Sequence, residues 1–374
     1  MLHNQPHLIS FCNRLQKNLL NFMIFDEMTQ DNLFQERPWR TMAVTLKDVA
    51  QMAGVSRSAV SRTFTDGASV SDKTRKKVEK AARELGYSPS FIARSLATNR
   101  TKLIGLVANN FQNPIFLEVF DLYTQALQEK GLRPLLVNLT NETDPEHSAQ
   151  MLRQYRVDGV IVATSTLPPE FAVAFKKADV PVVHAFGRFN PAHHVHVVGI
   201  DNQAGGRMAA QTLIDHGYKS VGFLGGPKFA TSTQDREQGF CQHLLENGVQ
   251  IADVRYADAY AYQAGRRAMH ELLDEKKVDA IFCGDDLICI GAMDEAWSKG
   301  LSIPQDIGFI GFNDMPMASW GAYNLTTIRQ PTRDIIKSSI ELVVSMVESP
   351  DRALETRLFP CEVVERGTLR PLPV

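Results

Sequence analysis

The sequence predicts an α/β protein in which a small helical unit precedes a two-lobed core of parallel sheets flanked by helices. Two short helices joined by a glycine turn are indicated over Thr45–Phe64. From Leu103 onward, short apolar runs alternate with stretches of helical periodicity, and this alternation runs through the chain about twice. Near-continuous apolar strands separated by helices are typical of parallel sheets covered on both faces, so two similar lobes are expected.

Composition describes an ordinary soluble protein whose charge is unevenly distributed. The 374 residues are 44% hydrophobic and 22% charged, enough for two or three domains. The net charge of −2 argues by itself against a nucleic-acid binder. However, residues 42–102 hold 12 Lys and Arg against 5 Asp and Glu, whereas residues 103–374 hold 24 against 33. A basic unit in front of an acidic core favours nucleic-acid binding by the former.

Residues 1–41 show no clear structural partner for their scattered apolar side chains. Met42 stands three residues before the helical unit, so we expect it to be the true start. Residues 1–41 would then be a disordered extension or an upstream translation. No secretory signal and no apolar run of about 18 residues is present. Five scattered cysteines without a Cys-x-x-Cys motif indicate free thiols, as expected for a cytoplasmic protein.

The helical unit, residues 42–88, is delimited by capping signals. Thr45 can cap the first helix in a capping box with Asp48. Gly54 suits the sharp turn that follows, because it has no Cβ atom. Ser56 can cap a second helix, Arg57–Phe64. The apolar face of the first helix is expected to comprise Val49, Met52 and Ala53.

The second helix has one packing face and one outward face. Ala59, Val60 and Thr63 can pack, which leaves a polar surface of Arg57, Ser58, Ser61 and Arg62. A short, fixed helix with arginines at its start is typical of helix-turn-helix units that read the DNA major groove. Many helical hairpins with a glycine turn contact no nucleic acid, so the spacing alone leaves both interpretations open. A third helix, Asp72–Leu85, has a basic outer face suited to phosphate contact.

Residues 89–102 form a linker with a helical pattern of about eight residues. Such a helix is too short to be stable alone and is expected to order on a partner. Leu96 either packs on the neighbouring domain or acts as an apolar wedge in a DNA minor groove, flanked by Arg94 and Arg100.

The core, residues 103–374, is expected to contain alternating strands and helices. Strands are predicted at 103–108, 135–138, 159–163, 181–185, 195–200, 221–224, 280–283 and 307–312. Helices are predicted at 116–128, 145–156, 170–177, 204–216, 235–247, 264–273, 290–299 and 335–347. Ligands are expected at the loops that follow the strands.

Several motifs resemble the LacI-type family of bacterial transcriptional repressors. They include T-L-K-D-V-A-Q-M-A-G-V-S-R-S-A-V-S-R, G-I-D-N-Q-A-G-G, D-R-E-Q-G-F and I-G-F-I-G-F-N-D through L-T-T-I-R-Q-P, in the family's order over 44–374. The resemblance implies a DNA-binding head, a hinge helix and a periplasmic-binding-protein-like core. Lobe 1 would comprise about 103–199 and 331–358, and lobe 2 about 200–330 and 359–374. It also implies a homodimer on a pseudo-palindromic operator and a small-molecule effector.

The resemblance assigns DNA-binding roles by position. Arg57 and Ser58 match the base-reading pair, Arg62 supports them, and Leu96 matches the minor-groove wedge. An arginine can contact a guanine with two hydrogen bonds. Ala97 stands where some relatives carry a lysine, which weakens the case for a backbone contact there. The expected DNA-binding set is Thr45, Ser56, Arg57, Ser58, Ser61, Arg62, Arg94 and Leu96.

An effector cleft is implied in the same way. Arg236 matches a cleft arginine whose donors suit sugar hydroxyls or a carboxylate, although an ordinary salt bridge is the alternative. Tyr260 falls where relatives place an aromatic residue that stacks on a sugar. Phe186 and Asn313 stand where many relatives have Asp, so the ligand stays open, with a sugar or sugar acid favoured. The expected effector-binding set is Asn110, Phe116, Phe186, Arg236, Tyr260, Asp285 and Asn313.

Two other classes of protein fit less well. A transport-type binding protein would have an export signal and no basic head, and an enzyme would need a catalytic constellation that we do not find. His193, His194 and His196 could suggest a metal, but a loop-edge histidine cluster is the simpler interpretation, so no metal or cofactor is expected. A strand is predicted at Phe359–Val364, and no heptad segment follows it, so a dimer is expected rather than a coiled-coil tetramer.

Overall fold

The computed structural model describes residues 44–65, 67–88, 95, 100–109, 111–140, 144–275, 277–349 and 352–373. The chain divides into two compact units, one ending at Arg94 and the other beginning at Ser95. We call the described part of the first unit the head and the second unit the core. The predictions for 1–41, the hinge helix, Arg94, Leu96 and Asn110 lie outside the described residues. Within the described ranges, no helix is long and apolar enough to cross a membrane.

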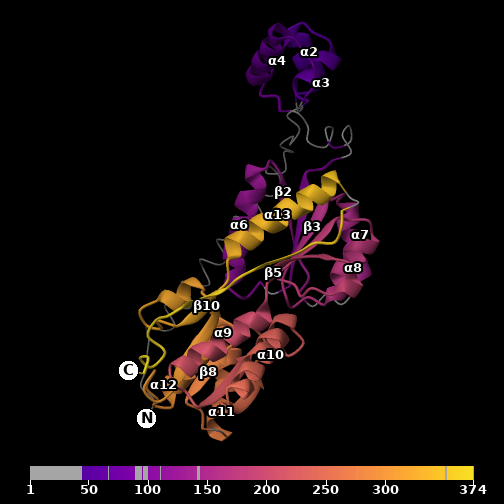
Figure 1. Ribbon diagram of the computed structural model, residues 1–374. Helices are drawn as coiled ribbons and strands as arrows, with labels where there is room; N and C mark the ends of the chain where they lie inside the picture. The colour runs from indigo at the N-terminus through magenta and orange to yellow at the C-terminus, as the bar shows by residue number, and fades with distance from the viewer. Residues whose placement is uncertain are drawn as a thin grey trace, which may run out of the picture. The chain divides into compact units, whose positions relative to one another are not determined.

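The head consists of α2 (Leu46–Ala53), α3 (Arg57–Thr63) and α4 (Asp72–Leu85) (Figure 1). The predicted capping box is present, because Thr45 Oγ1 accepts from Asp48 N and Thr45 N donates to Asp48 Oδ2. Gly54 has the left-handed φ of 63° that its turn requires. The packed side chains of the three helices form a small apolar core of Val49, Ala50, Val60, Val78, Ala81 and Ala82.

One residue of the predicted head core is placed differently. Met52 is 48% exposed, and Ala50 is buried instead. The buried face of α2 runs through Val49, Ala50 and Ala53, and Met52 points roughly 100° away from its centre.

Lobe 1 of the core is a parallel six-stranded sheet with the order β11-β5-β4-β3-β1-β2. Helices α6 and α13 cover one face, and α7 and α8 cover the other (Figure 1). The strands are β1 (Leu103–Ala108), β2 (Arg133–Asn138), β3 (Gly159–Ala163), β4 (Val182–Ala185), β5 (His196–Ile200) and β11 (Thr356–Phe359). The helices are α6 (Ile115–Glu129), α7 (Pro145–Gln154), α8 (Pro169–Lys177) and α13 (Thr332–Glu348).

Lobe 2 repeats this architecture with the order β12-β10-β9-β8-β6-β7, in which only β12 is antiparallel to its neighbour. Helices α9 and α10 pack together on one face, and α11 and α12 on the other. The strands are β6 (Ser220–Gly225), β7 (Gln250–Tyr256), β8 (Ala280–Cys283), β9 (Gly308–Asn313), β10 (Thr327–Arg329) and β12 (Glu362–Val364). The helices are α9 (Asn202–Asp215), α10 (Thr231–Glu246), α11 (Tyr262–Glu275) and α12 (Asp286–Ser298).

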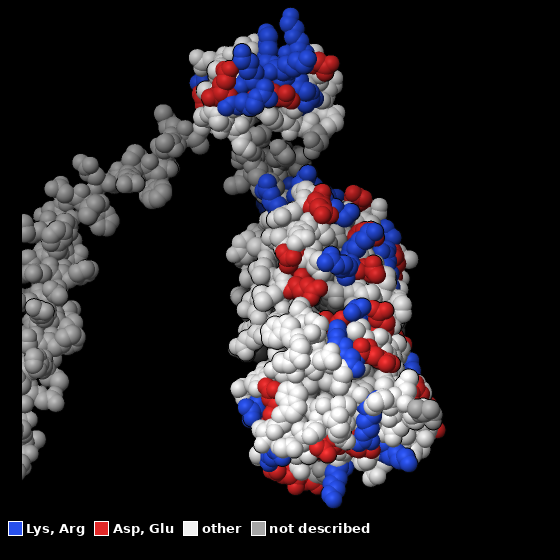
Figure 2. All heavy atoms as spheres, turned by 90° about the vertical axis from the view of Figure 1, so that its left-hand side faces the viewer, with Lys and Arg blue, Asp and Glu red and all other residues white. Residues whose placement is uncertain are grey.

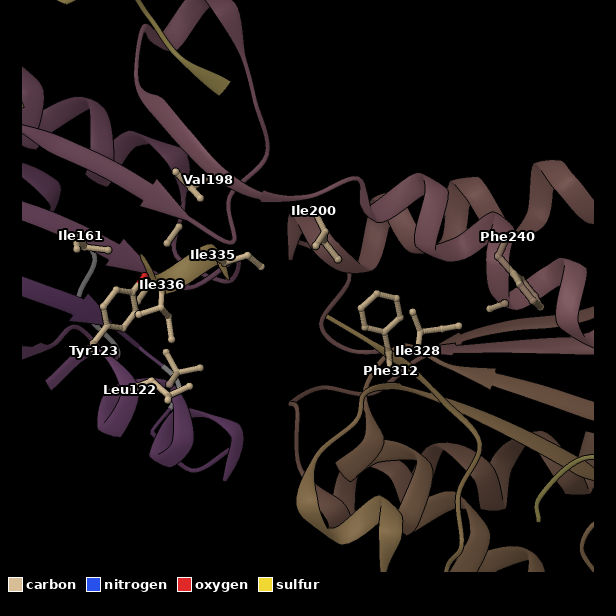
Figure 3. Packing of buried hydrophobic residues seen from close by; sticks show 14 of the residues in the cluster. Leu122, Tyr123, Ile161, Val198, Ile200, Phe240, Phe312, Ile328, Ile335 and Ile336 are labelled. Atoms are coloured by element: carbon tan, nitrogen blue, oxygen red, sulfur yellow. The ribbon is translucent and has the colours of Figure 1, made fainter. Parts of the chain in front are cut away.

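The chain passes between the two sheets three times, after β5, after β10 and after β11. The prediction of one strand over Phe359–Val364 is therefore wrong, since β11 belongs to lobe 1 and β12 to lobe 2. Pro360 lies at this break, where it has no amide hydrogen for either sheet. Figure 3 shows the buried apolar residues gathered in two groups, one in each lobe, with Ile200 between them.

Candidate functional site

A cleft between the two lobes holds a cavity of about 70 Å³. One water needs roughly 10–15 Å³ by this measure, so the cleft can take a small molecule, and a larger one only if the lobes separate. Lobe 1 contributes most of the apolar lining, namely Ile115, Phe116, Val119, Ala163, Phe186 and Ile200. Lobe 2 contributes a polar lining of Asn202, Ser232, Arg236, Tyr260, Asp285, Asn313 and Gln330.

Arg236 is the buried cation of the cleft. It lies on α10 with 6% of its surface exposed, and its guanidinium carbon lies 3.5 Å from the centre of the Phe312 ring. Its Nε donates to Asn202 Oδ1 at 2.8 Å, and its Nη1 donates to the Gly284 carbonyl at 2.6 Å. Both acceptors are neutral, so neither of these hydrogen bonds is the salt bridge that the sequence left open as an alternative. Burial lowers the pKa of Arg236, yet an arginine stays protonated in proteins.

Asp285 organises the polar wall. Its Oδ1 caps α12 by accepting from the backbone nitrogens of Leu287 and Ile288, and its Oδ2 accepts from two side-chain amides. These are Asn313 Nδ2 at 2.8 Å and Asn113 Nδ2 at 3.1 Å, the latter from lobe 1. Burial raises the pKa of Asp285, and the hydrogen bonds oppose that rise. Each carboxylate oxygen thus has two donors, which fixes the amides around the cleft.

The apolar wall depends on an unusual backbone conformation at Phe186. Its φ of 62° lies in the left-handed region, which bulky residues rarely adopt. The backbone nitrogen of Phe186 donates to the Val198 carbonyl at 2.8 Å and so fixes the residue on β5. Gly187 follows, and a Cβ atom there would lie 2.5 Å from the His184 ring. The close approach therefore requires glycine at this position.

Tyr260 lines the cleft, but its ring is held by lobe 2. The side chain is 7% exposed, and its hydroxyl lies 2.8 Å from Thr233 Oγ1 and 3.0 Å from Ser232 Oγ. A Cβ atom on Gly226 would lie 2.4 Å from this ring, so the ring packs directly on the Gly226 backbone. This packing covers part of the ring that was expected to stack on a sugar.

All six described residues of the expected effector-binding set therefore line one cavity. The motif comparison missed several neighbours, which are Asn113, Ser165, Asn202, Ser232 and Gln330. Asn202 and Gln330 each lie just beyond the carboxyl end of a strand, the position where parallel sheets bind ligands. That rule, applied to the predicted strand over 195–200, would have found Asn202, whereas Gln330 follows β10, which the sequence did not predict.

The histidine cluster lies elsewhere, at the start of β5 in lobe 1. His196 is buried, and its Nδ1 accepts from the backbone nitrogen of Glu355 at 3.1 Å. Among the described side chains, no group of three or more His, Cys, Asp or Glu is arranged to hold a metal ion. The cysteines in the same ranges, Cys241, Cys283, Cys289 and Cys361, are free thiols.

The head presents a second candidate surface. Arg57, Ser58, Ser61 and Arg62 are all exposed on α3. Ser56 caps this helix by accepting from Ala59 N at 3.2 Å. Lys and Arg side chains gather over the head in Figure 2. On α4, Arg75 donates to the Thr63 carbonyl at 3.0 Å and so ties α4 to the end of α3.

Two family models match the sequence. Residues 45–90 match that of bacterial regulatory proteins of the lacI family, and residues 210–369 match that of a periplasmic binding protein-like domain. Among curated proteins, the chain is 30% identical to the HTH-type transcriptional repressor CytR of Escherichia coli (strain K12), covering 88% of this chain and 98% of CytR. It is 33% identical to the repressor PurR of Serratia proteamaculans (strain 568), with the same coverage.

Solved structures give the same result. The lac repressor dimer bound to operator and the anti-inducer ONPF superposes with a TM-score of 0.80 and 26% identity, over 87% of this chain and 99% of that chain. The complex of the transcriptional regulator CelR with cellobiose superposes with a TM-score of 0.65 and 28% identity, with the same coverage.

Proposed function

Since this chain belongs to the LacI family of bacterial regulatory proteins, we propose that α3 of its head reads operator DNA and that its cleft binds the controlling effector. The exposed row of polar and basic side chains on α3 carries the DNA part of the proposal; Ser56 caps α3, and Thr45 caps the neighbouring α2. Arg57 and Ser58 would contact bases, while Ser61 and Arg62 would contact bases or phosphates. Arg94 and Leu96 would act in the minor groove.

Two matched arginine variants, one on α3 and one on α4, test the proposed DNA-binding surface by their effect on operator binding. Operator sequences are first selected from random DNA with the full chain, and binding is then measured by fluorescence anisotropy at several salt concentrations. Arg57→Met should cost about 1–3 kcal/mol of discrimination between selected and random DNA. Arg83→Met removes an exposed arginine of α4 and should leave that discrimination intact. Equal discrimination in both variants would contradict the assignment of α3.

The effector part of the proposal is supported most by Arg236. The side chain of Asn202 and the carbonyl of Gly284, which accept its two hydrogen bonds, are neutral, so an effector oxygen can share the same guanidinium without displacing a carboxylate. We propose a sugar or sugar acid, in agreement with the hydroxyls and amides of the lobe 2 wall. A thermal-shift screen of sugars, sugar acids and nucleobases should find a stabilising compound. The same compound should not stabilise Arg236→Met, whereas an unchanged shift would place its site outside the cleft.

We further propose that the chain acts as a cytoplasmic homodimer. The lac repressor is a dimer on its operator, and here large apolar side chains are exposed in both lobes. Leu117 on α6 is 73% exposed, and Trp320 beyond β9 is 55% exposed. Helices α6 and α12 lie on the left of Figure 1, and much of that side carries no charge in Figure 2. Sedimentation of Trp320→Glu should show monomers if this side forms the dimer interface.

A further inference from the structure

An ion pair that neither proposed binding role uses joins the two lobes at the rim of the cleft. Arg188 lies in lobe 1, two residues beyond Phe186, and Asp235 lies on α10 in lobe 2. Arg188 Nε donates to Asp235 Oδ2 at 2.8 Å, and Arg188 Nη2 lies 2.7 Å from Asp235 Oδ1. This two-point geometry is the strong form of an arginine–carboxylate pair. We call Arg188 and Asp235 the rim clasp.

Two further acceptors of α10 complete the grip on Arg188. Its Nη2 also donates to the Thr231 carbonyl at 2.9 Å and to Gln234 Oε1 at 3.1 Å. The four acceptor atoms all belong to residues 231–235, the amino-terminal part of α10. A single side chain of lobe 1 therefore holds the start of a lobe 2 helix.

The position of Arg188 is fixed by the residues before it. Phe186 has a left-handed backbone, and Gly187 packs against the ring of His184. A sparsely populated backbone conformation persists only where its surroundings determine it, and such positions cluster at functional sites. Phe186 itself lines the cleft, so lobe 1 places a cleft residue and a clasp residue on one fixed segment.

Lobe 2 likewise places a cleft residue and a rim-clasp residue on one segment, which here is α10. Asp235 and Arg236 are consecutive, and successive side chains of a helix point roughly 100° apart. Asp235 accordingly points to the rim, while Arg236 points into the cleft. A molecule that shifts Phe186 or Arg236 therefore acts on a residue that lies one or two positions from the rim clasp in the sequence.

We propose that Arg188 is a positioning residue for effector binding. Through the rim clasp it holds α10, and with it Arg236, against lobe 1 and so sets how often the lobes are closed. The pair is partly screened, because the Arg188 side chain is 38% exposed and that of Asp235 is 13% exposed. Among the described residues, three other side-chain hydrogen bonds join the lobes at the cleft: Ser165 Oγ to Ser232 Oγ at 2.8 Å, Asn113 Nδ2 to Asp285 Oδ2 at 3.1 Å, and Thr231 Oγ1 to the Ser165 carbonyl at 3.3 Å. Loss of Arg188 should shift the lobes toward the open state without abolishing closure.

Hydrogen–deuterium exchange of the full chain, without added ligand or DNA, tests this inference. In Arg188→Gln, peptides covering 163–167 and 230–236 should exchange on the order of tenfold faster, because opening exposes both cleft walls. Peptides covering β8 should be unchanged, since that strand lies inside the lobe 2 sheet. Arg267→Gln is the matched control, because it breaks an exposed pair with Asp258 on lobe 2.

Charge-reversal variants distinguish loss of the Arg188–Asp235 ion pair from a general destabilisation of the fold. Arg188→Asp and Asp235→Arg should each accelerate exchange of the cleft peptides, and the double variant should restore much of the protection. Unchanged exchange in Arg188→Gln, faster exchange throughout lobe 2, or no rescue in the double variant would each overturn the inference. Only the link between lobe closure and effector binding rests on the proposed function; the role of Arg188 in closure does not. Failure here would leave the operator and effector experiments unaffected, and their failure would not alter these exchange rates.

Discussion

The two walls of the cleft differ in chemistry and in how they are held. The lobe 1 wall supplies the apolar lining, with Phe116 and Phe186 as its largest side chains, beside the polar residues Asn113, Thr164, Ser165, Thr166 and Thr332. The lobe 2 wall consists of amides, hydroxyls, Asp285 and Arg236. A molecule that fits both walls would meet apolar side chains mainly on its lobe 1 side and hydrogen-bonding groups on both sides. The sequence departures from related proteins at Phe186 and Asn313 fall on opposite walls.

The walls also depend on different sources of rigidity. Lobe 1 fixes Phe186 through the backbone, by the strand contact at Val198 and the glycine that follows. Lobe 2 fixes its wall through side chains, because Asp285 accepts two amides and Phe312 supports Arg236. Substitutions should therefore damage lobe 2 through lost packing and hydrogen bonds, and lobe 1 through lost backbone geometry.

The largest effect is expected from Phe312→Ala. Phe312 is fully buried in lobe 2 and carries the Arg236 guanidinium on its ring. Removing a buried phenylalanine costs about 3–5 kcal/mol in the free energy of unfolding, measured by urea denaturation. Phe116→Ala in lobe 1 is the comparison, and it should cost clearly less because that ring is only half-buried. Equal losses would remove the distinction between the walls.

The stability contributed by a buried acid in lobe 2 and by a buried histidine in lobe 1 should depend on pH in opposite directions. Burial raises the pKa of Asp286 in lobe 2 from 3.8 to about 7, despite hydrogen bonds from Thr327 and Met315. Burial lowers the pKa of His184 in lobe 1 from 6.5. The stabilising contribution of Asp286 is therefore complete below its unfolded pKa and is lost as pH rises to about 7. That of His184 is complete above pH 6.5 and is lost as pH falls through its lowered pKa.

Urea denaturation of the wild type against Asp286→Asn and His184→Gln measures these two contributions separately. The stability advantage of wild type over Asp286→Asn should decline between pH 4 and 7, by up to ~4 kcal/mol for the full shift. The advantage over His184→Gln should decline below pH 6.5 instead. If the stability advantage of wild type changed with pH in the same direction for both variants, the opposite pKa shifts of Asp286 and His184 would be contradicted.

The smallest effect is expected at Phe186. Asparagine tolerates the left-handed backbone, so Phe186→Asn should change the free energy of unfolding by no more than about 1 kcal/mol. Valine is apolar but resists this conformation, so Phe186→Val should be the more destabilising variant. A reversed order of the two in urea denaturation would mean that the apolar contact, and not the backbone, holds this wall.

Local sequence signals predicted most of the fold. The caps at Thr45 and Ser56 and the apolar runs of the inner strands act within a few residues, so they can be read directly. The sequence did not predict strand β7. It is a half-buried edge strand that includes Asp253 and Arg255, so it lacks the continuous apolar run of the inner strands. Strand β10 has only three residues, too few for a pattern.

The candidate site was predictable only where a motif marks it. Arg236 and Asp285 stand in motifs shared with the family, and the structure places them in one cavity. Asn113 and Arg188 act through partners 172 and 47 residues away in the sequence. No local periodicity encodes such a contact, since it exists only after both lobes have formed and closed.

The three crossings between the sheets also set the order in which the lobes can be completed during synthesis. Helix α13 and strand β11 belong to lobe 1, yet they follow almost all of lobe 2 in the chain. Until Ile335, Ile340 and Val343 emerge from the ribosome, one face of the lobe 1 sheet lacks the part of its cover that α13 supplies. Lobe 2, by contrast, then lacks the short edge strand β12 and the tail after it, in which Thr368 bonds to Phe309 and Leu369 packs in the core. The lobe whose strands are made first is thus finished late, and its apolar face needs protection from aggregation while lobe 2 folds.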